Sequence, residues 1–135
     1  MTLNEPVHLQ GRSASLTFRK VAREVVVLEI TGSDGGEHGK APFACLERAL
    51  ADGPFSLFVD ARDTKGASLD VSNSWAQWLA RNRHRLGRVH MLTGSRFVKL
   101  TADFVRRFAG LGDMMVLYDD PSVFEETLEA ATHVA

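Results

Sequence analysis

The sequence predicts an α/β fold: one domain with a mixed, mainly parallel β-sheet, an N-terminal antiparallel hairpin and about four amphipathic helices. Only the four residues 20–23, counted from the last residue of the first β-rich run, precede the second run, which suits a hairpin and is too short for a helical crossover. Each later apolar run is followed by a stretch of helical periodicity, and strands joined through helices pair in parallel. The 135 residues are expected to form a single domain, with residues 1–12 as an extra strand or a loose segment.

The hairpin is predicted from two β-rich segments. Residues 14–20 alternate apolar and polar side chains, as in a half-buried strand, and residues 24–32 are β-branched and mostly apolar, as in a central strand. The polar, glycine-rich residues 32–39 predict a flexible loop. Pro42 suits the first turn of a helix. That helix has an apolar stripe of Phe43, Leu46 and Leu50 and ends at Asp52-Gly53-Pro54.

The middle of the chain predicts a buried strand, a polar loop and a second helix. Residues 57–59 are apolar on both faces, and the strand ends at the carboxylates Asp60 and Asp63. A loop over residues 64–74 is expected to lead into the helix, which ends at Gly87. Its apolar markers are Trp75, Trp78, Leu79 and Leu86. Loops at the carboxyl ends of parallel strands are common ligand and partner sites, so this loop is the first candidate for function.

Two more strand–helix units complete the predicted sheet. Strands are expected over residues 88–93 and 114–118. The helix between them ends near Gly110. Its predicted core face is Phe97, Leu100, Phe104, Val105 and Phe108. Asp120 and Pro121 start the last helix through a side-chain cap and a proline in its first turn.

Charge is unevenly distributed along the second half of the chain. Residues 81–107 carry eight basic side chains and one acidic side chain, Asp103, whereas residues 108–135 carry six acidic side chains and no Lys or Arg. The basic residues are Arg81, Arg83, Arg85, Arg88, Arg96, Lys99, Arg106 and Arg107. The basic 81–107 and acidic 113–129 surfaces could be solvated faces of neighbouring helices, or could pair in a homodimer.

The element order and three local motifs resemble the STAS superfamily (sulfate transporter and anti-sigma factor antagonist), and its SpoIIAA-like, or STAS/SEC14-like, group in particular. The motifs are a strand ending in aspartate at residues 58–63, the loop 64–74 that leads into a helix, and the strand-to-helix junctions at residues 88–95 and 115–120. The resemblance covers roughly residues 14–131. It implies a bacterial STAS-like domain with a regulatory, non-enzymatic role.

Signalling members of this superfamily bind a partner protein, and phosphorylation at the start of the helix after the aspartate strand switches that binding. Their motif reads roughly Asp-Ser-Ser/Thr-Gly, which residues 70–73 match at Asp70 and Ser72, so Ser72 is the candidate phosphosite. The alternative is that Ser72 only caps the helix. The residues expected at the partner-binding surface are Asp63, Lys65, Asp70, Ser72, Asn73, Trp75 and Trp78.

The SEC14-like side of the resemblance suggests an alternative function, a carrier or sensor of a small amphipathic or lipid-like ligand. Its pocket is expected between the helix at residues 97–109 and the sheet, lined by Phe97, Phe104 and Phe108.

Several other kinds of site are not expected. Asp60 is not expected to serve as the aspartate of a receiver domain, because the acidic pair needed after the first strand and the lysine needed after the last strand are missing. The Gly39-Lys40 pair lacks the rest of a phosphate-binding loop, and no nucleophile elbow occurs. The histidines and the lone Cys45 lack metal-ligand spacing, so neither a metal nor a cofactor is expected. Nucleic acid is an improbable partner at pI 6.5. Without an apolar run of about 20 residues or a signal sequence, we expect a cytoplasmic protein with no membrane span.

Overall fold

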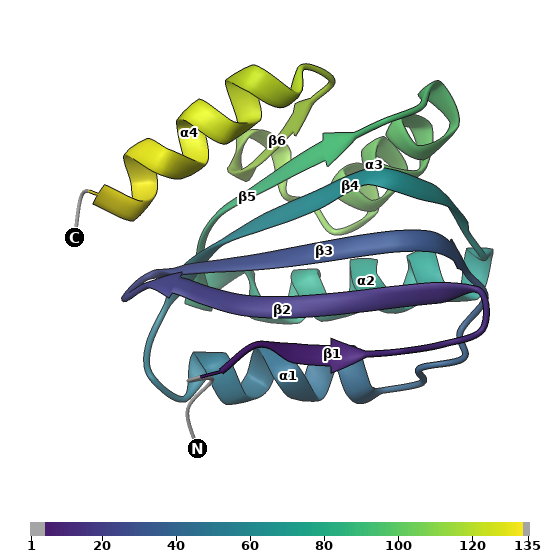
Figure 1. Ribbon diagram of the computed structural model, residues 1–135, viewed down its shortest axis with the longest axis horizontal. Coiled ribbons are helices and arrows are strands. Elements are labelled where there is room, and N and C mark those ends of the chain that lie inside the picture. The colour runs from purple at the N-terminus through teal and green to yellow at the C-terminus, as the bar shows by residue number, and fades with distance from the viewer. Residues whose placement is uncertain (1–4, 134–135) are drawn as a thin grey trace.

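Six strands form one sheet whose spatial order follows the chain order, β1-β2-β3-β4-β5-β6 (Figure 1). The computed structural model describes residues 5–133. The strands are β1 (Val7–Leu9), β2 (Ala14–Ala22), β3 (Val25–Asp34), β4 (Phe55–Ala67), β5 (Leu86–Thr93) and β6 (Met115–Tyr118). The pairs β1–β2 and β2–β3 are antiparallel, and the pairs β3–β4, β4–β5 and β5–β6 are parallel. The predicted fold class is therefore confirmed.

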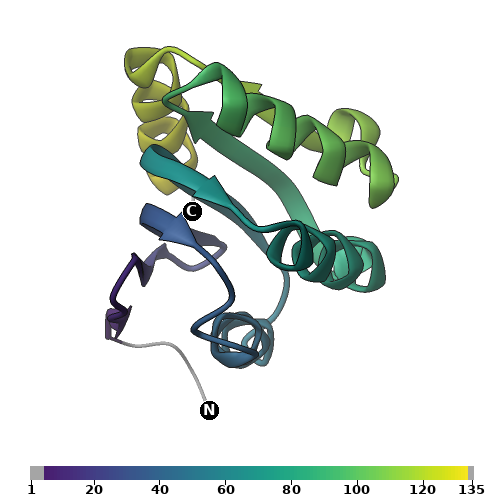
Figure 2. The same cartoon turned by 90° about the vertical axis from the view of Figure 1, so that its right-hand side faces the viewer.

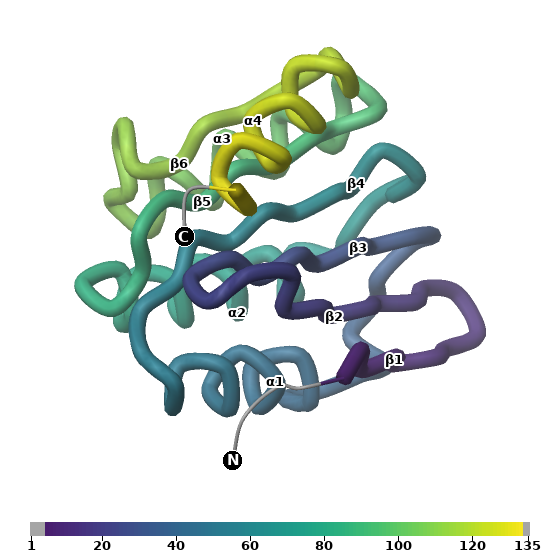
Figure 3. The backbone as a smooth tube through the Cα atoms, turned by 60° about the vertical axis from the view of Figure 1, so that its left-hand side comes forward, coloured from purple at the N-terminus to yellow at the C-terminus, as the bar shows by residue number. Residues whose placement is uncertain are grey.

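Four helices cover both faces of the sheet. They are α1 (Ala41–Leu50), α2 (Leu69–Asn82), α3 (Arg96–Phe108) and α4 (Pro121–His133), and short 3₁₀ turns lie at Arg83–Arg85 and Gly112–Met114. Figure 2 shows α1, α2 and α3 on one side of the sheet and α4 on the other. Figure 3 shows β1 at the edge of the sheet, beyond β2. No helix among the described residues is long and apolar enough to cross a membrane.

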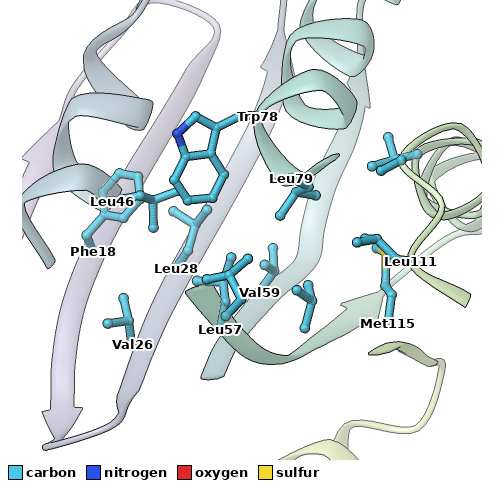
Figure 4. Close-up of a cluster of buried hydrophobic side chains, with 14 of the residues drawn as sticks. Phe18, Val26, Leu28, Leu46, Leu57, Val59, Trp78, Leu79, Leu111 and Met115 are labelled. Atoms are coloured by element: carbon cyan, nitrogen blue, oxygen red, sulfur yellow. The ribbon is translucent and has the colours of Figure 1, made fainter. Parts of the chain in front are cut away.

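The main hydrophobic core lies between the sheet and the helices α1, α2 and α3. Figure 4 shows Leu46 of α1 and Trp78 and Leu79 of α2 packed over Leu28, Leu57 and other strand side chains. A smaller core lies under α4, where Phe124 packs with Val25, Val27, Phe58 and Leu92. Alternation along the strands accounts for the two cores, because successive side chains point to opposite faces.

The loops predicted after β3 and β4 are shorter than expected, because both strands continue. Gly32 pairs with Thr64, and Asp34 pairs with Ala67, so the two strands run on together beyond their apolar segments. The hydroxyl of Thr64 also donates a hydrogen bond to the carbonyl oxygen of Ile30, at 2.8 Å. The prediction that a loop begins at Thr64 was wrong, since polar residues here are held by strand pairing rather than by burial of apolar side chains.

The core face predicted for α3 was also wrong, apart from Val105. The buried residues are Val98, Ala102, Val105 and, directly after the helix, Ala109. The large side chains Phe97, Leu100, Phe104 and Phe108 are exposed. Both rows have helical spacing, and the row of smaller side chains is the one that lies against the sheet.

Candidate functional site

The start of α2 is tied to the ends of β3 and β4. Ser68 is the N-cap, and its Oγ accepts a hydrogen bond from the backbone N–H of Val71 at 3.2 Å. The backbone N–H of Ser68 donates to the carbonyl oxygen of Asp34 at 2.9 Å. Serine is favoured at an N-cap because its side chain satisfies an N–H that has no partner within the helix. Ser68 thus fixes where α2 begins.

The residues predicted to bind a partner do not form one continuous surface. Asp63 and Lys65 lie on β4 and are exposed. They alternate with Thr64 and Gly66, whose side of the strand lines a cavity beneath α2 and α3. Asp63 and Lys65 therefore point toward the other face of the sheet. They are separated from the remaining predicted residues, which all lie on α2.

Along α2, the predicted residues differ in exposure. Asp70 is exposed, and Asn73 is half-buried. Ser72 is buried, and its hydroxyl donates a hydrogen bond to the carbonyl oxygen of Ser68 at 3.0 Å. A phosphate on Ser72 requires α2 to unpack from the sheet. The serine at the start of the helix is Ser68, four residues earlier in the chain.

The two tryptophans of α2 have different surroundings. Trp78 is buried, and its Nε1–H donates a hydrogen bond to Oε1 of Glu47 on α1 at 3.1 Å. Trp75 is half-buried and meets Phe43 edge to face, with ring centroids 4.9 Å apart. Trp78 is therefore part of the core, whereas Trp75 lies at its margin and is accessible from outside.

A surface hollow of about 360 Å³ lies beside Trp75, between the loop after β3, the start of α1 and the start of α2. We call it the α2-start hollow. Phe43 and Trp75 supply its aromatic side chains, Gly36 contributes backbone, and Lys40 and Asp70 carry opposite charges. An aromatic surface with a cation and an anion beside it suits a protein contact, since aromatic side chains anchor interfaces.

The loop that lines this hollow was predicted to be flexible, but a carboxylate fastens it to the β1–β2 connection. Glu37 accepts hydrogen bonds from the backbone N–H groups of Arg12, Ser13 and Ala14 and from the Ser13 hydroxyl, at 2.9 to 3.2 Å. These bonds, that of the Ser13 hydroxyl foremost, lower the pKa of Glu37. Sequence reasoning missed Glu37, because its partners lie more than 20 residues earlier.

An apolar cavity of about 90 Å³, here called the inner cavity, lies between the sheet and the helices α2 and α3. Its lining includes Val59, Met91, Ser72, Trp75, Leu79, Val98, Thr101 and Ala102. The prediction that Phe97, Phe104 and Phe108 line a pocket here was wrong in its residues, because all three lie on the outer side of α3. A cavity between α3 and the sheet is nevertheless present.

The inner cavity and the α2-start hollow share part of their walls. Asp34, Val71 and Trp75 line both. The first two turns of α2 therefore separate an internal space from an external one. A change in the position of these turns alters both at once.

Asp60, at the end of the apolar part of β4, is held by a neighbouring arginine. Its carboxylate accepts hydrogen bonds from the backbone N–H and Nε–H of Arg62, at 3.1 to 3.2 Å, and Arg62 also donates to Glu125 of α4 at 2.7 Å. These bonds raise the pKa of the Arg62 guanidinium, with Asp60 contributing most. Within residues 5–133, no group of three metal-ligating side chains is found.

The basic and acidic segments of the chain meet at the edge of the sheet. Nζ of Lys99 on α3 lies 3.7 Å from a carboxylate oxygen of Asp119, and Arg88 donates to the carbonyl oxygen of Asp113 at 3.3 Å. The Lys99–Asp119 pair thus uses part of the charge complementarity within one molecule.

This arrangement of strands and helices is the SpoIIAA-like fold. A protein of the DUF3478 family from Shewanella loihica PV-4, described as having that fold, is 14% identical in sequence and superposes with a TM-score of 0.63. The match spans 93% of this chain and 98% of the Shewanella protein. An anti-sigma factor antagonist from Mycobacterium paratuberculosis is 15% identical, with a TM-score of 0.59 over 87% of this chain and 95% of its own. The anti-sigma factor antagonist SpoIIAA in its unphosphorylated form is 16% identical, with a TM-score of 0.54 over 83% of this chain and 95% of SpoIIAA.

At these identities the likeness describes the fold alone. No protein-family model matches the sequence, and no curated protein matches it.

Proposed function

We propose that this protein is a non-enzymatic regulatory module that docks another protein at the α2-start hollow. The observation that carries the proposal is the hollow itself, which is lined by the half-buried Trp75 together with Lys40 and Asp70. Hydrogen bonds of Glu37 and Ser68 hold its loop and the start of α2 in place. The fold shared with two anti-sigma factor antagonists supports a regulatory role. Rigid surroundings favour binding because little conformational entropy is lost on docking.

Phosphorylation of Ser68 is the regulation that fits this surface, in place of the Ser72 phosphorylation expected from the motif. Ser68 is half-buried at the N-cap, next to exposed residues 69 and 70, whereas Ser72 is buried. A phosphate adds about two negative charges. At Ser68 those charges would lie near Asp70 and alter the electrostatic character of the docking surface.

The test is quantitative co-purification from the native host with charge variants of the hollow. Lys40→Glu and Asp70→Lys are expected to lose the same partner that the wild type recovers, while Arg23→Glu, in the turn between β2 and β3, keeps it. Ser68→Asp is compared with Ser68→Asn, because both side chains cap a helix and only one adds charge. The proposal fails if the partner is recovered equally with all of these variants.

The inner cavity favours a second candidate function, the binding of a small apolar ligand. At about 90 Å³ it is smaller than an apolar cavity of about 150 Å³ that admits benzene, so a larger or lipid-like ligand requires α2 and α3 to move apart. Native mass spectrometry of the protein from its host tests this function. A bound molecule should be retained by Ala109→Val and lost in Ala102→Val, since only Ala102 lines the cavity.

The homodimer through the basic 81–107 and acidic 113–129 surfaces stays a prediction. Its test is sedimentation at increasing protein concentration and at low and high salt, because a contact between opposite charges weakens as salt rises.

A further inference from the structure

The side of α3 that faces away from the sheet carries a row of large apolar side chains that residues 5–133 leave exposed. Phe97, Leu100, Phe104 and Phe108 are 62%, 64%, 38% and 59% exposed, although they are all large and apolar. Their spacing of three, four and four residues places them along one side of the helix. We call this row the α3 ridge. It is distinct from the row of Val98, Ala102 and Val105, which packs against the sheet.

The apolar surface continues from the α3 ridge to the start of α2. A Cβ atom added to Gly66 would lie 3.5 Å from the ring of Phe97, and Leu69, three residues after Gly66, is 69% exposed. Only two other large apolar side chains within residues 5–133 are exposed, Val21 and Val123. Exposure of large apolar side chains is therefore concentrated on one face rather than scattered, and such patches mark interaction sites.

Basic side chains flank the α3 ridge. The helix carries Arg96, Lys99, Arg106 and Arg107 against a single acid, Asp103. Asp103 pairs with Arg106 and Arg107, and the Arg107 side chain remains largely exposed. Arg96 is exposed and has no carboxylate within 4 Å in the part of the chain that the structure describes. Lys99 lies 3.7 Å from Asp119, so two carboxylates are set against the four cations of α3, and the surroundings of the ridge keep a net positive charge.

We propose that the α3 ridge docks the protein on an anionic lipid surface, with α3 lying in the plane of the interface. A helix with phenylalanine and leucine on one side and Arg and Lys beside them fits that environment, because the apolar side chains enter the acyl boundary while the cations meet lipid phosphates. Figure 2 shows α3 at one end of the row of helices on its side of the sheet.

A second copy of this chain fits the ridge less well. A two-fold contact between two α3 ridges would bring each set of Arg and Lys side chains against the same set in the other molecule. Such like charges oppose association. A contact between the ridge of one molecule and the acidic segment of another avoids this repulsion, so it becomes an outcome that the experiment must detect.

The test is vesicle flotation of the full chain, with vesicles of phosphatidylcholine alone and of phosphatidylcholine containing phosphatidylglycerol. Wild type is expected to float with the anionic vesicles and to be released as salt rises. Phe97→Ser and Phe108→Ser should each lower the vesicle partition coefficient roughly tenfold, since each removes one inserted aromatic side chain. Val123→Ser, an exposed apolar residue on α4, is the matched control and should bind like wild type.

Charge variants and hydrodynamics complete the experiment. Arg96→Glu should weaken binding to anionic vesicles, whereas Arg23→Glu, away from α3, should not. Equal binding of wild type and Phe108→Ser, or no flotation with anionic vesicles, overturns the proposal. The proposal is also overturned if sedimentation shows a dimer that Phe108→Ser dissociates and the protein does not bind vesicles. The ridge would then be a contact between two copies of the chain. Thermal unfolding confirms that the Phe variants are folded.

Discussion

His90 is a buried histidine on β5 whose ring is held on two sides. Its Nδ1 lies 2.8 Å from the hydroxyl oxygen of Tyr118, and its ring stacks on Phe58 at a centroid distance of 4.2 Å. Burial, and secondly the positive charge of Arg88, lower the pKa of His90. The folded protein therefore holds this imidazole neutral at pH values where an exposed histidine is protonated.

This shift predicts a loss of stability in mild acid. The unfolded chain takes up the His90 proton at about pH 6.5, and the folded protein only at a lower pH. The contribution of His90 is thus fully present above about pH 6.5 and declines as the pH falls toward the folded pKa. Urea unfolding at about pH 7.5 and about pH 5.5 should give a larger loss for wild type than for His90→Gln. Equal losses in the two proteins would argue against a buried, neutral His90.

A second prediction concerns the Glu37 carboxylate, which fastens the loop after β3 to residues 12–14. Glu37→Gln replaces one acceptor oxygen with an NH₂ group that faces backbone donors. The amides of Ser13 and Ala14 should then exchange with solvent faster, whereas Glu126→Gln, on α4, should leave them unchanged. Because the pKa of Glu37 is lowered, the same loosening should occur in wild type only as the pH falls below about 4.5 and through the lowered pKa. Unchanged exchange in Glu37→Gln would mean that backbone pairing alone holds the loop.

At the scale of elements, periodicity predicted which elements form and in what order. The hairpin, the parallel strands and the helices could be predicted because each buries a face with a regular apolar repeat. Periodicity could not decide between the two apolar rows of α3, since both Phe104 and Val105 fit a helical stripe. The choice depends on the space between helix and sheet, which is a property of the assembled fold. Of the residues predicted to bind a partner, Asp70 and Trp75 line the α2-start hollow, and their role in binding stays a prediction. Lys40 and Phe43 were not predicted for it, because they lie about 30 residues earlier in the chain and only the folded structure brings them beside α2.

The start of α2 carries an element-scale prediction, that Ser68 caps the helix. Ser68→Ala removes the acceptor for the Val71 N–H and should lower the free energy of unfolding by about 1 kcal/mol. Ser68→Asp should retain the cap and, beside the helix N-terminus, most or all of the stability. Chemical denaturation of the two variants checks both statements. A loss in Ser68→Asp as large as that in Ser68→Ala would indicate that the hydroxyl has another structural role.

At the scale of the whole molecule, the shared wall connects the two candidate functions. Val71 and Trp75 line both the inner cavity and the α2-start hollow, and Ser72 links the cavity to the N-cap through its bond to Ser68. We expect a molecule that enters the cavity to shift side chains that also line the hollow. Ligand binding and partner docking at α2 are therefore expected to be thermodynamically coupled, and each must affect the other equally.

The coupling can be tested by filling the cavity from its far side. Ala102 lines the cavity from α3, so Ala102→Val occupies part of the space and should push on the first turns of α2. In a Trp78→Phe background Trp75 is the only tryptophan. Its fluorescence emission should shift with Ala102→Val, because one side of the indole borders the cavity and the other lies near solvent. Ala109→Val, buried on the same segment but outside the cavity lining, should leave the emission in place.

The reciprocal background separates this coupling from a general loosening of α2. In Trp75→Phe the remaining tryptophan is Trp78, which is buried, bonded to Glu47 and absent from the cavity lining. Its emission should not respond to Ala102→Val. If both tryptophans shift together, the helix moves as a body. If neither shifts, the cavity absorbs the added methyl groups without reaching the hollow, and the two candidate functions are independent.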